Sequence, residues 1–239
     1  MRSEALHRLE CLLHARKLGA TVAAAARTPS PVVATGAVEL DRQLGGGWPC
    51  GAISDLVGRP STGRTGLLMS TLARAAADGQ VVALVDACDR FDPRSAADAG
   101  LDLDRLLWVR GAPLTVEWAR RSVLDRALRQ AVRAFDLILR AGGFAVVALD
   151  LADVPAAAVR RLPPATWLRL AHVNEGRSTV GLMVGSAPIG RSARGVSVQL
   201  EGRPVWSGSS AQSRRFERFA PTWRLQSAAR PPGSLKDCG

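Results

Sequence analysis

The stretch ISDLVGRPSTGRTGLLMSTLARAAADG, residues 53–79, decides the fold class of this chain. It begins with an apolar run at Ile53–Val57, passes through a loop bounded by Gly58 and Gly63, and continues as an apolar helical pattern over Leu67–Ala77. A strand, a glycine-bounded loop and a helix in direct succession are typical of an α/β protein.

Further apolar runs of the same kind follow along the chain. They are continuous rather than alternating, and stretches with helical periodicity, such as Thr115–Ala141 and Ala165–Val173, lie between them. This pattern indicates a parallel sheet with both faces covered. We therefore predict an α/β fold with a mostly parallel central sheet flanked by helices. The runs are 81–85, 106–109, 144–149 and 179–185.

Polar or small residues stand where these strands are expected to end. Gly58, Asp86, Asp150 and Ser186 lie at or just past the carboxyl ends of four runs. Ligands of open parallel sheets bind beyond those ends. We therefore expect the four positions to converge in space.

The loop at residues 58–65 matches the phosphate-binding pattern G-x-x-x-x-G-K-[ST], the P-loop, at every position but one. Its glycines let backbone N–H groups turn inward, and the following helix adds the positive end of its dipole. Thr65 and Asp150 would hold Mg²⁺ if a magnesium nucleotide binds. The predicted nucleotide-binding residues are Gly58, Ser61, Gly63, Arg64, Thr65 and Asp150.

Arg64 is the departure from that pattern, because it stands where lysine is expected. Lysine carries a compact point charge, whereas arginine carries a longer planar fork that is not equivalent at a crowded phosphate. A misplacement of about 1 Å costs roughly 10²-fold in rate. We expect weak binding of ATP and Mg²⁺ and weak or absent hydrolysis, and we predict no catalytic residue. Alternatively, the loop survives only as architecture.

The composition is strongly basic, with a net charge of +11, and 30 of the 32 basic residues are arginine. Such a charge favours nucleic acid, or a partner bound to it, although high arginine usage also reflects genome composition. Four cysteines without a C-x-x-C pair predict reduced thiols and no metal site. The charged N-terminus and the lack of a long apolar run favour a cytoplasmic protein without a membrane span.

The chain divides into three segments by composition. Residues 1–30 are expected to form an N-terminal helix and linker, and residues 31–200 a degenerate P-loop domain. Residues 201–239 carry a net charge of +4 and are expected to form a basic, partly disordered tail whose deletion leaves the sheet folded. Short strands are expected at Val196–Leu200 and Thr222–Gln226.

Arginine and aromatic residues interleave near the C-terminus. This mixture suits stacking on single-stranded nucleic acid or a protein interface, and we favour the interface. The candidate DNA or partner contacts are Arg191, Arg194, Arg214, Arg215, Phe216, Arg218 and Trp223.

The chain resembles the core of the RecA recombinases over roughly residues 35–186. Within that family, its shortened and degenerate form is most similar to ImuA, the RecA-like accessory proteins of bacterial mutagenesis cassettes. The segments that carry the resemblance are Thr35–Asp41 and Leu44–Gly51 before the P-loop, Val85–Pro93 and Ala99–Leu107 after it, and Phe144–Asp150, which is similar to the Walker B strand.

The resemblance implies that most hydrolysis groups are lost. Arg64 replaces the P-loop lysine, Cys88 the glutamate that activates water, and Ser186 the glutamine that senses the γ-phosphate; the Walker B aspartate is kept as Asp150. A thiol with a reference pKa near ~8.5 is a poor general base. The aspartates at 86 and 89 lie off the matched position. The resemblance also places Arg160, Arg161 and Arg169 in a DNA-contacting region, where a solvated helix face is the alternative.

The resemblance further implies a function. It is that of a non-catalytic RecA-like adaptor in damage-induced (SOS) mutagenic translesion DNA synthesis. The implied partners are an ImuB-like Y-family polymerase relative, an error-prone C-family DNA polymerase, RecA and DNA, with a homo-oligomer as a further possibility and the nucleoid as the location. The alternative function is that of an ATP-dependent DNA-binding recombinase-type ATPase.

Overall fold

The computed structural model describes residues 31–113, 121–208, 210 and 213–227. The helix and linker predicted over 1–30, and the end of the tail, lie outside the described residues. In chain order the described elements are β1 (Val32–Val33), α3 (Val38–Leu44), β2 (Trp48–Pro49), β3 (Ala52–Gly58), α4 (Arg64–Ala77), β4 (Val82–Asp86), α5 (Pro93–Asp98), η1 (Leu103–Arg105), β5 (Leu106–Arg110), α6 (Arg121–Ala141), β6 (Val146–Asp150), α7 (Ala156–Val159), α8 (Pro164–Asn174), β7 (Val180–Gly185), β8 (Val196–Ser207) and β9 (Arg215–Ser227).

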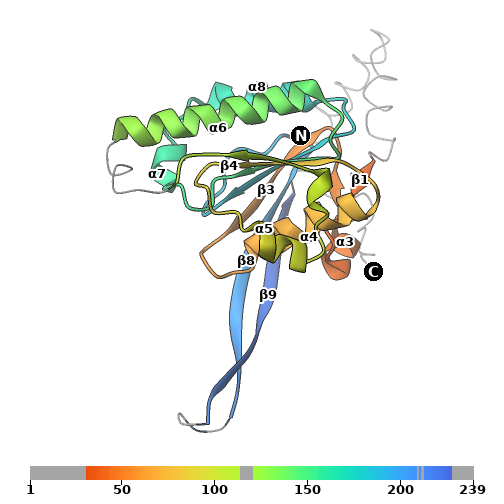
Figure 1. Cartoon of the computed structure of the whole chain (residues 1–239), viewed down its shortest axis with the longest axis vertical. Helices are drawn as coiled ribbons and strands as arrows, with labels where there is room; N and C mark the ends of the chain where they lie inside the picture. Colours follow the sequence, from red (N-terminus) through yellow and green to blue (C-terminus); the bar gives the residue numbers. More distant parts are fainter. Residues whose placement is uncertain (1–30, 114–120, 209, 211–212, 228–239) are drawn as a thin grey trace, which may run out of the picture. The chain divides into compact units, whose positions relative to one another are not determined.

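A central sheet carries the fold (Figure 1). Within the described ranges it has seven strands in the order β5-β4-β6-β7-β3-β8-β9, and all neighbours are parallel except the antiparallel pair β8–β9. β1 and β2 pair separately. The prediction of an α/β fold with a mostly parallel sheet flanked by helices is confirmed.

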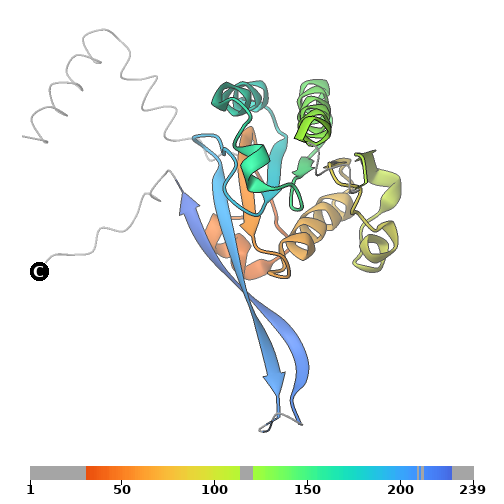
Figure 2. The same cartoon turned by 90° about the vertical axis from the view of Figure 1, so that its left-hand side faces the viewer.

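Helices cover both faces of the sheet, as Figure 2 shows with α6 and α8 on one face and α4 on the other. The residues of one strand alternate between two cores. In β6, Val147 and Leu149 join the core under α6 and α8, whereas Val146 and Ala148 join the core over α4. Burial on both faces is the reason why these strands read as continuous apolar runs.

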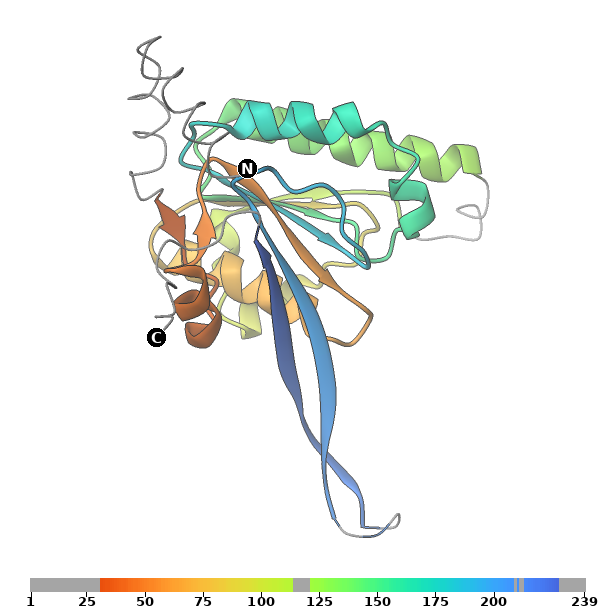
Figure 3. The same cartoon turned by 180° about the vertical axis from the view of Figure 1, so that it is seen from behind.

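The strands β8 and β9 form a long hairpin, visible from behind in Figure 3. Its pairing runs from Val196 opposite Ser227 to Ser207 opposite Arg215, with a bulge next to Trp206. The boundary expected at residue 200 therefore falls inside β8, and the expected short strands are the inner half of longer ones. Outer residues of a two-stranded ribbon are held by cross-strand hydrogen bonds rather than by burial, so their polar sequence resembles a loop.

The inner half of the hairpin belongs to the domain. Leu200 is buried, and Trp223 and Leu225 pack against the core over α4. The indole N–H of Trp223 also donates to Gln43 Oε1 at 3.1 Å. Deletion of residues 201–239 would therefore remove side chains that pack against the core. Among the described helices, none has the length and apolar character needed to cross a membrane.

Candidate functional site

The P-loop keeps the backbone geometry that its sequence predicts. Gly63 caps α4 in the left-handed region with φ of 95°, and Ser61 has φ of 62°. A Cβ at Gly58 would lie 2.3 Å from Thr62 Oγ1, so the loop requires glycine there. The Thr62 hydroxyl closes the turn by donating to the Arg59 carbonyl at 2.8 Å. The strand, loop and helix of a phosphate cradle are all present.

Arg64 lies buried within this cradle, with 5% of its surface exposed. One guanidinium nitrogen donates to the Gly58 carbonyl, and another donates to the Ala152 carbonyl at 3.1 Å. The second nitrogen also lies 3.6 Å from Asp153 Oδ1. The guanidinium thus binds the protein's own oxygens, and it ties the P-loop to the segment after β6.

The two candidate Mg²⁺ ligands are Thr65, which is exposed at the start of α4, and Asp150, which ends β6. Asp150 Oδ1 accepts the Ala152 N–H at 2.8 Å. Burial, and more weakly the neighbouring Asp86, raises the pKa of Asp150 to about 6. At neutral pH this carboxylate is mostly ionised and suits a hard cation. The backbone cradle and these two groups fit a magnesium nucleotide, but the engaged Arg64 does not.

Cys88, which stands at the position of the catalytic base, is unsuited to that role. Cys88 is buried, and burial, followed by the charges of Asp150, Asp153 and Asp86, raises the pKa of its thiol to about 12. Asp86 accepts the Phe91 N–H at 2.8 Å.

Asp89, the other aspartate considered as a base, forms a two-point ion pair with Arg110. Both of its oxygens accept from the Arg110 guanidinium at 2.9 Å. That hydrogen bond lowers the pKa of Asp89, which makes it a weaker base.

The strand ends converge as expected. Asp86 and Asp150 are register partners on β4 and β6, and Asp150 is opposite Val184 on β7. Ser186 follows β7 directly and is exposed. Gly58 ends β3, and Arg64 links its carbonyl to the Ala152 carbonyl, which follows β6.

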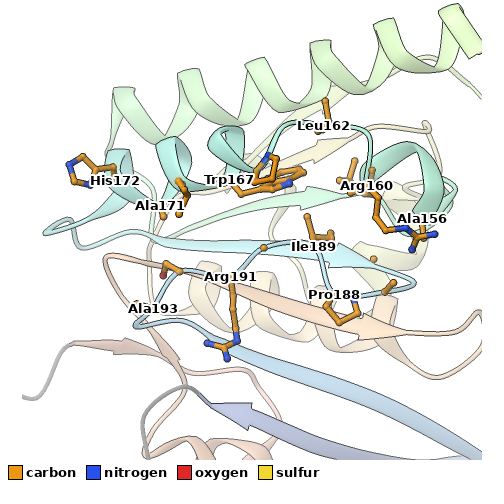
Figure 4. A pocket seen from close by; sticks show the side chains of 18 of the residues that line it. Ala156, Arg160, Leu162, Trp167, Ala171, His172, Pro188, Ile189, Arg191 and Ala193 are labelled. Carbon is orange, nitrogen blue, oxygen red and sulfur yellow. The ribbon is translucent and has the colours of Figure 1, made fainter.

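A groove, which the sequence did not predict, adjoins this edge (Figure 4). It encloses about 660 Å³ between α7, α8 and the loop 186–195. Arg191 and Arg194, two of the predicted contact residues, line it, and so does Arg160. The loop lies against α8 so closely that a Cβ at Gly190 would be 2.9 Å from Trp167 Cγ.

Asp55 is the residue beneath this loop that sequence reasoning missed. It lies in the centre of β3 with 1% of its surface exposed. Burial raises the pKa of its carboxyl to about 6, while backbone N–H groups of residues 189–191 and the charge of Arg191 act in the opposite direction. A single acid inside the apolar stretch Ile53–Val57 was the available signal, because a buried charge normally has a specific partner.

The remaining predicted contacts are not part of the groove. Arg214 and Arg215 are exposed at the start of β9, and Trp223 is half-buried at the domain core. Phe216 and Arg218 lie on β9, where the structure describes their backbone. Of the predicted contacts, Arg191 and Arg194 thus line the groove, and the other five lie on the hairpin or directly beside it.

The comparisons with known proteins agree with this architecture. The family model described as RecA N-terminal domain matches residues 14–157, more than half of the chain. Protein RecA of Prochlorococcus marinus (strain AS9601) is 36% identical over 115 residues, which cover 48% of this chain and 30% of the relative.

A second relative gives a similar result. Protein RecA of Synechococcus elongatus (strain ATCC 33912 / PCC 7942 / FACHB-805) is 37% identical over 115 residues, which cover 48% of this chain and 31% of the relative. The matched region is thus under a third of each relative's length. Since the family model covers more than half of the chain, including the whole P-loop and four strands of the central sheet, the chain belongs to the family of the RecA N-terminal domain.

Proposed function

We propose that this RecA-family chain is a non-catalytic adaptor of the ImuA type in damage-induced mutagenic translesion DNA synthesis. Its proposed partners are an ImuB-like Y-family polymerase relative and an error-prone C-family polymerase, with RecA and DNA as further contacts on the nucleoid. The observation that carries the proposal is the engagement of Arg64 with the carbonyls of Gly58 and Ala152.

Loss of turnover follows from three features together. The buried guanidinium is held on protein oxygens, the thiol at Cys88 stays protonated, and Ser186 has neither the reach nor the amide of a glutamine. A retained sheet with these losses supports a role in protein contacts. The resemblance to ImuA supplies the identity of the partners.

ATP hydrolysis with and without single-stranded DNA tests the non-catalytic part of the proposal. The unmodified protein is expected to show no DNA-stimulated turnover, with a RecA protein as the positive control. Arg64→Lys alone is expected to remain inactive, because the residue in the position of the water-activating glutamate is still Cys88. DNA-stimulated turnover by the unmodified protein would establish the recombinase-type alternative.

Co-expression with the two polymerase subunits tests the adaptor part. We expect a complex that survives size-exclusion chromatography, and we expect Arg64→Lys to leave complex formation unchanged. Failure of both subunits to co-elute with the unmodified chain would contradict the adaptor function.

A further inference from the structure

The groove beside α8 has an apolar floor. Trp167 is buried in its centre, and Ile189 on the opposite wall packs against the same core (Figure 4). Leu168 stands at the rim with 71% of its surface exposed. A volume of about 660 Å³ lies within the range of sites that enclose a compact organic group. Other apolar lining residues are Leu151, Val154, Val159 and Leu162.

The rim of the groove is basic. Arg160, directly after α7, and Arg191 and Arg194 on the loop line it, together with one acid, Glu175, at the far end of α8. His172 is the remaining titratable residue of the lining. An occupant that carries negative charge beside an apolar group would therefore complement both the floor and the rim.

The loop wall of the groove is fixed in place. Ser192 N–H donates to the Ile53 carbonyl at 2.9 Å, and Ile53 N–H donates to Ser192 Oγ at 3.0 Å. Asp55 beneath the loop attracts the backbone N–H groups of residues 189–191. A preformed wall reduces the ordering cost of binding, which favours short ligands.

We propose that this groove binds a short acidic peptide segment of a protein partner, with one bulky apolar side chain seated against Trp167. Single-stranded nucleic acid fits the groove less well, because stacking needs an accessible aromatic face and Trp167 is 8% exposed. The aliphatic walls suit a leucine, phenylalanine or tryptophan side chain. The assignment to a protein rests on the adaptor function proposed above.

Selection of random dodecapeptides displayed on phage against the full chain tests the groove. We expect enrichment of peptides that combine aspartate or glutamate with one large apolar residue. In fluorescence polarisation with a synthetic consensus peptide, replacement of its apolar residue by serine is expected to weaken binding about tenfold or more.

Matched variants locate the binding. Leu168→Asp and Arg160→Glu are each expected to lower the affinity for the consensus peptide about tenfold, since each removes a complementary contact and adds repulsion of the peptide's acidic residues. Leu137→Asp, at an exposed leucine of α6, and Arg169→Glu, beside Leu168 but outside the lining, are the controls and are expected to bind normally.

Three results would each overturn the proposal. The first is a selection without a consensus, and the second is a consensus peptide that binds the groove variants as tightly as the unmodified chain. The third is that oligothymidine displaces the peptide and itself binds the groove variants more weakly. The last result assigns the groove to nucleic acid. The two proposals fail separately. If the polymerase complex forms but no peptide is selected, the adaptor function stands and the groove is not a peptide site. If a peptide is selected but no polymerase complex forms, the groove remains an acidic-peptide site and the adaptor function is contradicted.

Discussion

In this P-loop, the Arg64 side chain makes contacts within the protein at a position where the pattern expects a phosphate-binding lysine. A P-loop directs backbone N–H groups inward and leaves the Gly58 carbonyl available, and an arginine fork is long enough to reach it and the Ala152 carbonyl together. A lysine has a single nitrogen and cannot reproduce both contacts with the same planar geometry. Arg64 is therefore expected to stabilise the fold more than it binds phosphate.

Substitution of Arg64 by lysine tests that role. We expect Arg64→Lys to lower the free energy of unfolding by about 1–3 kcal/mol, because a buried carbonyl loses its charged donor. Urea denaturation measures the change, with Arg59→Lys at an exposed position of the same loop as the control. Unchanged stability of Arg64→Lys relative to the unmodified protein would contradict a structural role.

Asp150 predicts a pH dependence of stability. Its folded-state pKa of about 6 lies above the ordinary value of 3.8, so the folded protein binds this proton more tightly than the unfolded chain does. The resulting stabilisation is complete below the ordinary pKa and is lost as the pH rises through about 6. Asp150→Asn keeps an oxygen to accept the Ala152 N–H but removes the titration.

Between about pH 4 and about pH 7, the stability of Asp150→Asn relative to the unmodified protein is therefore expected to rise by about 1–3 kcal/mol. Denaturation curves at several pH values measure this difference. Asp98→Asn, on the exposed end of α5, controls for the loss of one negative charge. A difference that is constant with pH would contradict the assignment to Asp150.

At the scale of elements, burial decides what the sequence can reveal. The strands β3, β4, β6 and β7 are buried on both faces, and each was predicted within one or two residues at either end. The P-loop was predicted because its glycines are required by the backbone. The groove was not, because it depends on how the loop 186–195 crosses β3, and that crossing is held by backbone hydrogen bonds, by Ser192 and by Asp55.

Asn174 is a second residue whose structural role could not be predicted from the sequence. Its buried amide nitrogen donates to the Ala52 carbonyl at 2.8 Å and to the Thr179 carbonyl at 3.0 Å, which fixes the end of α8 to the sheet. Nothing in the one-dimensional pattern marks it, since an asparagine at a helix end normally reads as a surface cap. Contacts between segments distant in sequence leave no periodic signal.

The hairpin can be divided experimentally between its inner and outer halves. Replacing residues 202–221 by Asn-Gly would join Glu201 to Thr222, which are register partners, through a two-residue turn. We expect this variant to keep its stability, because Leu200 and Trp223 stay in place, and to lose binding of a polymerase subunit in co-elution.

Deletion of residues 201–239 is the contrasting variant. It removes Trp223 and Leu225 from the core, so we expect a marked loss of stability in urea denaturation. Equal stability of the shortened and deleted forms would show that the inner half of β9 contributes nothing to the core. Normal co-elution of the shortened form would exclude the outer hairpin as a partner contact.

At the scale of the whole molecule, the positive charge is not spread evenly over the described surface. Many exposed arginines pair with acids, as Arg74 does with Asp78 at 3.0 Å and Arg140 with Asp136 at 3.0 Å. The outer face of α6 differs, since Arg126, Arg129 and Arg133 are exposed at helical spacing and none of them lies within ion-pair distance of a described acid, although the charge of Arg129 acts on Asp125. Three such charges on one face can follow a phosphate backbone.

Oligothymidine binding measured across a range of salt concentrations distinguishes this face from the groove. Replacing Arg126, Arg129 and Arg133 by glutamine should reduce the slope of log affinity against log salt by about 2, since each single-strand phosphate contact contributes about 0.7.

The same charge change at three ion-paired arginines, Arg74, Arg105 and Arg140, is the control and should alter the slope less, because a neighbouring acid already offsets each of those charges. Equal effects of the two triple variants would mean that only net charge matters. A larger effect of Arg160→Glu than of the α6 variant would instead place nucleic acid in the groove, and the acidic peptide would then need a different surface.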